Sequence, residues 1–360
     1  MTYGGDKLSP TLLLIAALLP LPSHKQSRSK AETSRLGAPT LALQMSVLYM
    51  AAGFSKVFES NWMAGTALRN ALNMDLLVKP IGVWASHAEF FLQISSVVTP
   101  YWELTLGALL LIPSLRGHIR TAAILGLLSL NFGIWLTMDV GYFMMYASSG
   151  LAGLLPTSFW QPLEHRLKAI YIPNLPAMTP LTRRESHWGP SLMLQRTVAV
   201  WLMVIFSITF MEGLKAFPRL PWSSWLWTAV RAPNTYQNWD LFKNPGPTAQ
   251  WYVTKAELSD GTVVDVLRDG DPVDYRRKRS RNDLFTDSFR WRLCFAKANK
   301  YWKHEETRDN IARNVARHWN DHQPSERRAH SIAVYKMTKK IFRDPPPPRH
   351  FKIFSDIPNI

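Results

Sequence analysis

Three long apolar stretches dominate the chain before about residue 215, and each has the length of a membrane-crossing helix. They cover residues 40–58, 119–138 and 196–213, and each is close to the roughly 20 residues that span a hydrocarbon core. Shorter apolar runs at 101–115 and 142–156 predict two further crossings. Residues 81–98 carry His87, Glu89 and Gln93 among aromatics, so this stretch either crosses or lies along the membrane surface.

The pattern changes from residue 233 onward, where polar and apolar positions begin to alternate. WYVTKAEL (251–258) and TVVDVL (262–267) flank the turn sequence SDG, which predicts a β-hairpin. Residues 310–322 predict a helix, and residues 331–342 predict a strand or a second helix. The end of the chain, RDPPPPRHFKIFSDIPNI, is too rich in proline to predict a regular element.

Together these patterns predict an all-α polytopic membrane helical bundle followed by a soluble α+β, β-rich C-terminal domain. We expect about five to six spans within residues 1–214, a linker at 215–232, the soluble domain at 233–345 and a proline-rich tail at 346–360. Basic loops at 23–35 and 116–120 favour the cytoplasmic side. Alternation of the spans then places the C-terminal domain of this integral, multi-pass protein on the non-cytoplasmic side.

The charge balance is strongly basic, with a formal net charge of +16. The cluster RRKRSR at 276–281 has no nucleic-acid-binding motif around it, and excess Lys and Arg commonly flank membrane spans. A surface that faces anionic lipid is therefore favoured, and we expect no nucleic-acid partner. Cys294 is the single cysteine, which excludes an intrachain disulfide and a cysteine zinc cluster, and we expect no metal.

Four polar residues fall within or beside the apolar stretches, where they are costly. Lys56 either extends its ammonium to water at the membrane surface or is a desolvated lysine that acts as a general base. Glu103 either sits among the headgroups or pairs with Lys56. Asn131 predicts an interhelical hydrogen bond, and Asp139, at the end of a span, is expected to face water.

The order of these segments resembles a known family. The sequence has GFSK at 53–56 followed by NW at 61–62, then PYWELTLGALLLIP, and then LNFGIWLTMDVGYF running into LLP and FW. This succession resembles the membrane domain of the vitamin K-dependent gamma-carboxylase-like family, also called the HTTM domain. The tail segments QNWDLFKNPGP, SDGTVVDV and SFRWR resemble the soluble portion that follows it. The chain begins as if the first helices of the domain were missing, like a shortened member.

The resemblance implies a chemistry. In the carboxylases a lysine deprotonates a reduced naphthoquinone, oxygen converts the quinone to an epoxide, and carbon dioxide then adds to a glutamate. It implies reduced vitamin K as cofactor, O2 and CO2 as co-substrates, and a Glu-containing protein as substrate. Lys56 falls on the position of the base, and Glu103, Asn131, Asp139, Gly141 and Phe143 are the candidates that line the quinone site.

One departure from the family pattern bears on activity. The family usually has a histidine where this chain has Asn131, and an amide cannot exchange protons near neutral pH. Three hypotheses follow: a membrane enzyme of the carboxylase type, a non-catalytic membrane protein that binds a lipid, a quinone or a partner protein on the same fold, or a plain anchor for the soluble domain.

Overall fold

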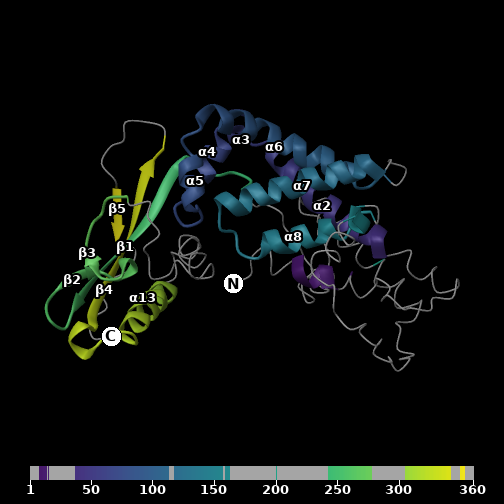
Figure 1. The fold of residues 1–360 in the computed structure, drawn as a ribbon. Helices are drawn as coiled ribbons and strands as arrows, with labels where there is room; N and C mark the ends of the chain where they lie inside the picture. Colours follow the sequence, from purple (N-terminus) through teal and green to yellow (C-terminus); the bar gives the residue numbers. More distant parts are fainter. Residues whose placement is uncertain are drawn as a thin grey trace, which may run out of the picture.

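The computed structural model describes residues 8–13, 15, 37–112, 117–156, 159–162, 200, 242–277, 305–341 and 349–352. Helices fill the N-terminal half and an antiparallel sheet with one long helix forms the C-terminal part (Figure 1). The predicted span at 196–213, apart from Val200, and the predicted linker at 215–232 lie outside the described residues.

The helical part is built from elements of very unequal length. Three long helices lie alongside one another, and short helices gather at the end nearest the sheet (Figure 1). In chain order they are α2 (Gly37–Val57), α3 (Ser60–Met63), α4 (Ala67–Ala71), α5 (Pro80–Ala85), α6 (Glu89–Leu109), α7 (Gly117–Thr137) and α8 (Phe143–Ala152).

The predicted helices at 40–58 and 119–138 are present as α2 and α7, with slightly shifted ends. The predicted division between 81–98 and 101–115 is wrong, because α6 continues from Glu89 to Leu109 with Pro100 inside it. Pro100 is buried, where protein packing makes up for the backbone hydrogen bond that proline cannot form. The run predicted at 142–156 contains only the ten-residue α8 and the turn after it.

Small residues allow α2 and α6 to pack closely. A Cβ atom added to Gly53 would lie 2.6 Å from the carbonyl oxygen of Pro100, and one added to Gly107 would lie 3.2 Å from the backbone nitrogen of Met50. Such glycines let helix backbones approach where a side chain would hold them apart. The close contact between α2 and α6 positions the polar side chains described in the next subsection.

The C-terminal part is a five-stranded antiparallel sheet in the order β3-β2-β1-β4-β5. Its elements are β1 (Thr248–Leu258), β2 (Val263–Asp265), η3 (Val266–Arg268), β3 (Asp271–Pro272), α13 (Glu305–Asn320), η4 (Ser325–Arg327), β4 (Ala329–Lys340) and β5 (Arg349–Lys352). The helix α13 covers one face of the sheet, where Trp319, Val315 and Ile332 belong to a buried apolar cluster.

The predicted hairpin is confirmed, since β1 and β2 pair antiparallel around SDG. Asp260 accepts hydrogen bonds from the hydroxyl and the backbone N–H of Thr262, and these bonds hold the pKa of its carboxyl below the usual range. The helix predicted at 310–322 is α13, and residues 331–342 form most of strand β4. The proline-rich end is not wholly irregular, because β5 pairs with β4; pairing to an existing edge gives short segments a partner that local sequence cannot reveal.

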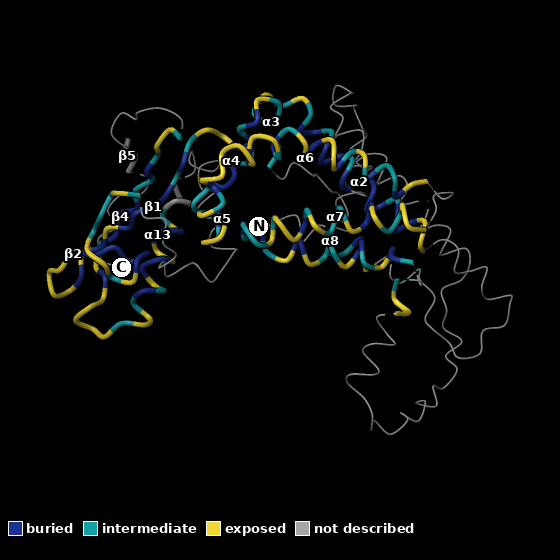
Figure 2. Tube along the Cα trace, turned by 45° about the horizontal axis from the view of Figure 1, so that its top comes forward, coloured by how far each residue is buried: buried dark blue, intermediate teal, exposed yellow. Residues whose placement is uncertain are grey.

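Figure 2 shows exposed segments along α5 to α8, and many of the exposed side chains there are large and apolar. Among its large side chains, Trp84 is 78% exposed, Phe90 77% and Phe132 59%. By length and apolarity together, one helix in the described part of the chain, α7, qualifies as a membrane span. The five to six spans expected from the sequence therefore remain a prediction.

Candidate functional site

A buried ion pair joins the last turn of α2 to α6. Lys56 Nζ lies 2.6 Å from Glu103 Oε2, and the two side chains are 5% and 7% exposed. The close approach at Gly53 brings this pair together, because Gly53 precedes Lys56 by almost one turn and its α-carbon faces Glu103. Of the two interpretations of Glu103, the structure shows the one in which it pairs with Lys56.

Lys56 is turned inward, which rules out the alternative in which its ammonium reaches water at the membrane surface. Its Nζ also donates to the carbonyl oxygen of Ala52 at 3.2 Å and lies 5.5 Å from the centre of the Trp62 ring. An ammonium has three donor hydrogens. In the described part of the chain two of them are engaged, by Glu103 and by the carbonyl oxygen of Ala52.

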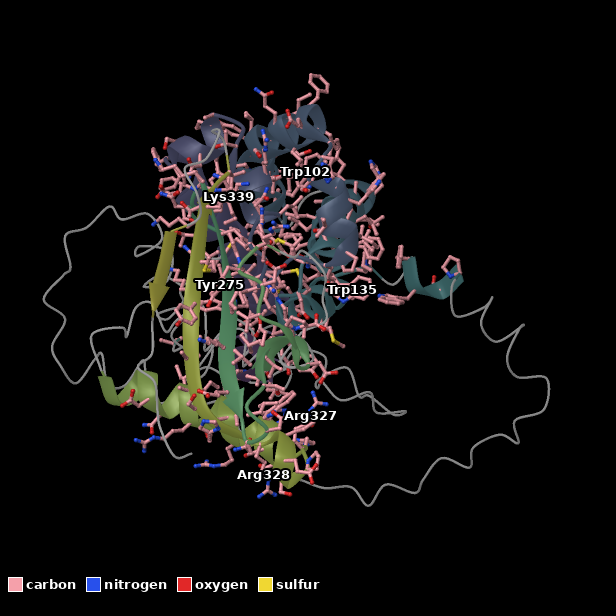
Figure 3. All side chains as sticks on the ribbon, turned by 90° about the vertical axis from the view of Figure 1, so that its left-hand side faces the viewer. Trp102, Trp135, Tyr275, Arg327, Arg328 and Lys339 are labelled. Carbon is pink, nitrogen blue, oxygen red and sulfur yellow. The ribbon has the colours of Figure 1, made fainter. Side chains whose placement is uncertain are left out.

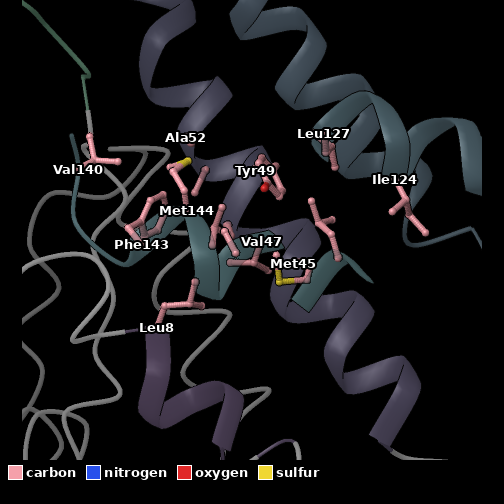
Figure 4. Close-up of a cluster of buried hydrophobic side chains, with 14 of the residues drawn as sticks. Leu8, Met45, Val47, Tyr49, Ala52, Ile124, Leu127, Val140, Phe143 and Met144 are labelled. Carbon is pink, nitrogen blue, oxygen red and sulfur yellow. The ribbon is translucent and has the colours of Figure 1, made fainter. Parts of the chain in front are cut away.

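A second polar bridge links three helices next to this pair. Tyr49 on α2 donates its hydroxyl to Asn131 Oδ1 on α7 at 3.0 Å, and Asn131 Nδ2 donates to the hydroxyl of Ser148 on α8 at 3.2 Å. The predicted interhelical hydrogen bond of Asn131 is thereby confirmed. Figure 4 shows Tyr49 among the apolar side chains that surround it, including Leu127 and Met144.

A cavity of about 590 Å³ lies beside both bridges. Lys56 and Glu103 are the charged side chains among the described residues that line it, and most of the remaining lining is apolar. One side of the lining consists of residues of α6 and α7 that are also exposed on the outer surface, such as Phe91, Ile94 and Trp102. On this side, the residues that line the cavity are therefore also part of the apolar outer surface.

The structure brings four of the six sequence-predicted site residues together. Lys56, Glu103, Asn131 and Phe143 all line the cavity. Asp139 and Gly141 do not line it and instead form the turn before α8, where Asp139 Oδ1 accepts from the backbone N–H of Gly141 at 3.1 Å. Gly141 has a φ of +65°, which favours glycine in that turn. Asp139 is partly exposed, so it reaches water only in part.

Tyr49, Trp62 and Phe242 are among the lining residues that sequence reasoning missed. Tyr49 precedes Lys56 by two helical turns, so its position on the same face of α2 was a usable signal. Trp62 gave only the signal of a tryptophan close after Lys56. Phe242 belongs to the C-terminal part and gave none, because only the tertiary fold brings it to the cavity.

The C-terminal part is attached next to this cavity. The guanidinium of Arg277 donates to both carboxylate oxygens of Asp75 at 2.6 Å and to the backbone oxygen of Asn73 at 3.0 Å. Leu76 packs against the apolar cluster under α13. Arg277 of the basic cluster therefore contacts protein, residues 278–281 lie outside the described residues, and the lipid-facing surface stays a prediction.

With this geometry established, the chain was compared with known proteins. No protein-family model, no curated protein and no solved structure matches it. The resemblance to the carboxylase-like family therefore stays a hypothesis. What the site can do must be argued from its own residues.

Proposed function

We propose that this chain is a membrane protein whose helical part binds a quinone-like molecule beside Lys56 and Glu103 and moves a proton from it. The observation that carries the proposal is the cavity of about 590 Å³, apolar over most of its wall and charged at one place. Ligand sites of this size typically combine an apolar lining with a few polar groups that fix orientation. A ring with one or two hydroxyl groups suits such a lining.

The bilayer is the partner that the outer surface suits best. Trp84, Phe90, Phe91 and Phe132 are each more than half exposed on α5, α6 and α7. Large exposed apolar patches are rare on soluble monomers, and aromatic side chains are favoured at membrane–water interfaces. This placement suits the lateral boundary of the cavity, since an apolar ligand dissolved in lipid would reach it between α6 and α7. It also suits the multi-pass arrangement expected from the sequence.

The ion pair sets how a proton can move. While Lys56 is an ammonium paired with Glu103, it has no lone pair and cannot accept a proton. The 2.6 Å contact allows Lys56 Nζ to pass a proton to Glu103 Oε2 as it receives one from a ligand hydroxyl. The base is then the pair, with Lys56 as the atom that touches the ligand and Glu103 as the final acceptor. The dry surroundings strengthen both contacts.

A reduced naphthoquinone bound here would supply the oxygen-dependent chemistry of the carboxylase-like family, ending in its epoxide. The residues that would hold it are Lys56 at the polar end and Trp62, Trp102 and Phe143 along the ring. Flat aromatic side chains pack well against a flat ring. Carbon dioxide addition to a Glu-containing protein would be the second half of the reaction.

Non-catalytic binding is the second candidate, and Asn131 favours it. Its amide is held by Tyr49 on one side and Ser148 on the other, an arrangement that fixes the helices but exchanges no protons. On this alternative the same cavity binds a lipid or a quinone without converting it, or the apolar surface binds a partner protein.

The deciding experiment measures oxygen-dependent epoxidation of a reduced naphthoquinone by membranes that contain the full chain. Lys56→Ala and Glu103→Gln should each abolish the reaction, because each breaks the proton path. Lys255→Ala, which changes an exposed lysine on β1, is the control and should leave the rate unchanged. Binding of the quinone by the wild type without any epoxide formation would favour the second candidate. If the wild type neither binds the quinone nor forms the epoxide, both quinone hypotheses are rejected.

A further inference from the structure

The cavity wall is not made by the helical part alone. Phe242, which precedes the first strand of the C-terminal part, lines the cavity together with Lys56, Glu103 and Trp62. It also packs against the buried apolar cluster of the helices. A side chain far along the sequence thus completes a site that α2 and α6 begin.

Residues 242–245 are fastened to the short helices by a series of hydrogen bonds. Trp62 Nε1 donates to the carbonyl oxygens of Phe242 at 3.1 Å and Lys243 at 2.9 Å. Pro245 contributes its carbonyl oxygen to Asn61 Nδ2 at 3.1 Å and to Asn70 Nδ2 at 3.0 Å. The segment is therefore held through its backbone oxygens. These bonds depend on the backbone conformation of residues 242–245 and not on the identity of their side chains.

The side chain of Asn244 adds to this attachment. It accepts from Asn61 Nδ2 at 2.6 Å and donates to Glu59 Oε2 at 2.9 Å. Glu59 precedes α3 and Asn61 lies within it, a few residues after Lys56 at the end of α2. The residues that bind Asn244 thus lie only a few positions after Lys56 in the sequence.

Phe242 adopts a backbone conformation that it would not choose by itself. Its φ of +54° lies in the left-handed region, which is strained for a bulky residue and persists only when its surroundings enforce it. The hydrogen bonds to Trp62 supply that enforcement. Releasing the segment would relieve the strain and withdraw the ring from the cavity, so the closed arrangement depends on continued attachment.

The same C-terminal part is held to the helices by the Arg277–Asp75 pair, whose side chains are 19% and 11% exposed. The segment after Asp75 is in turn joined to the end of α7, because Val78 pairs with Met138 and Lys79 N–H donates to the Thr137 carbonyl at 2.8 Å. Thr137 and Met138 both line the cavity. Figure 3 shows the described side chains in a view from the side of the sheet.

We propose that residues 242–245 are a lid on the cavity, with Phe242 as a ligand-contacting residue, and that the Arg277–Asp75 pair holds this lid closed. The inference rests on the proposed function for the identity of the ligand, a quinone-like ring, but the lid itself follows from the contacts. Docking of the C-terminal part and occupancy of the cavity then favour one another, and such coupling is necessarily reciprocal.

The test uses the full chain in detergent micelles, with menadione as the probe and quenching of tryptophan fluorescence as the signal. Arg277→Asp should raise the Kd for menadione roughly tenfold, within the usual range of coupling between sites. The charge exchange Asp75→Arg with Arg277→Asp should bring the Kd back towards the wild-type value. Arg317→Asp, an exposed arginine on α13, is the control and should leave the Kd unchanged.

A second measurement follows the lid without any ligand. Phe242→Cys in a Cys294→Ser background should react slowly with a maleimide, faster when Arg277→Asp is added, and slowly again in the charge-exchange variant. If menadione binds and neither the Kd nor the labelling rate responds to Arg277→Asp, the lid is rejected. If menadione does not bind but labelling follows the charge pair, the lid stands and the proposed ligand class fails. If menadione does not bind and labelling ignores the charge pair, both are rejected.

Discussion

Lys56 and Glu103 form a 2.6 Å ion pair between α2 and α6, almost completely shielded from solvent. Neither residue is near the other in sequence, and each lies in an apolar helix. The desolvation penalty of a buried ion pair often exceeds the stability gained from its attraction. The position of this pair on the wall of a cavity therefore favours a role in ligand binding over a role in stability.

Breaking this pair on one side should be far more damaging than removing it altogether. Lys56→Met or Glu103→Leu leaves the partner as a buried, uncompensated charge, which costs about 3–5 kcal/mol. The double variant should recover most of that loss, because no charge is left unpaired. Thermal unfolding of the four proteins in detergent gives the coupling free energy. Additive single effects would mean that the two side chains do not interact in solution.

The close packing of α2 on α6 should not tolerate even one methyl group at Gly53. In Gly53→Ala the new Cβ would meet the Pro100 carbonyl oxygen at 2.6 Å, and a backbone atom cannot rotate away. We expect a loss of about 1–3 kcal/mol, the usual cost of overpacking. Gly117→Ala on α7 is the control, since nothing lies within 4 Å of its added Cβ. Equal stability of the two variants would contradict the observed approach of the helices.

Removing the hydroxyl of Tyr49 should weaken the three-helix bridge. In Tyr49→Phe the buried Asn131 Oδ1 loses its donor, at a cost of about 1–3 kcal/mol for an unsatisfied buried acceptor. The unfolding temperature in detergent should fall accordingly. Tyr142→Phe changes a tyrosine that is 62% exposed and should have little effect. A similar fall of the unfolding temperature in both variants would show that the loss of the Tyr49–Asn131 hydrogen bond is not its cause.

Filling the boundary of the cavity should weaken ligand binding without unfolding the protein. Gly133 on α7 lines the cavity, and an added Cβ there meets open space. Gly133→Phe should therefore raise the Kd for menadione by about tenfold, which corresponds to 1.4 kcal/mol. Gly117→Phe, also into open space but away from the cavity, should bind as the wild type does. Unchanged binding in Gly133→Phe would locate the ligand outside this cavity.

Introducing a charge on the outer surface tests whether that surface faces a bilayer or water. Leu125 on α7 and Val263 on β2 are both 43% exposed. An arginine near the middle of a spanning helix opposes insertion by about 2.5–3.5 kcal/mol, whereas one on a water-facing strand costs little. Leu125→Arg should thus leave membranes on alkaline extraction far more readily than Val263→Arg. Equal retention of both variants would show that this face of α7 does not meet lipid.

The sequence by itself determined the elements whose pattern is long or strongly punctuated. The apolar lengths of α2 and α7, the SDG hairpin and the amphipathic α13 were all predicted, because hydrophobic periodicity and turn residues act locally. Lys56, Glu103 and Asn131 were singled out because polar groups in apolar segments need partners. The family resemblance, and the activity that it implies, remain predictions.

Only the tertiary structure decided which partners those groups have. The continuity of α6 through Pro100 depends on packing against α2, and the inward turn of Lys56 depends on Glu103 lying opposite. Phe242 and Arg277 reach the helices across a large separation in the chain, with no local signal for their contacts. Local patterns fix which segments are helix or strand, but long-range contacts depend on how their faces fit together in space, and here that fit creates the cavity.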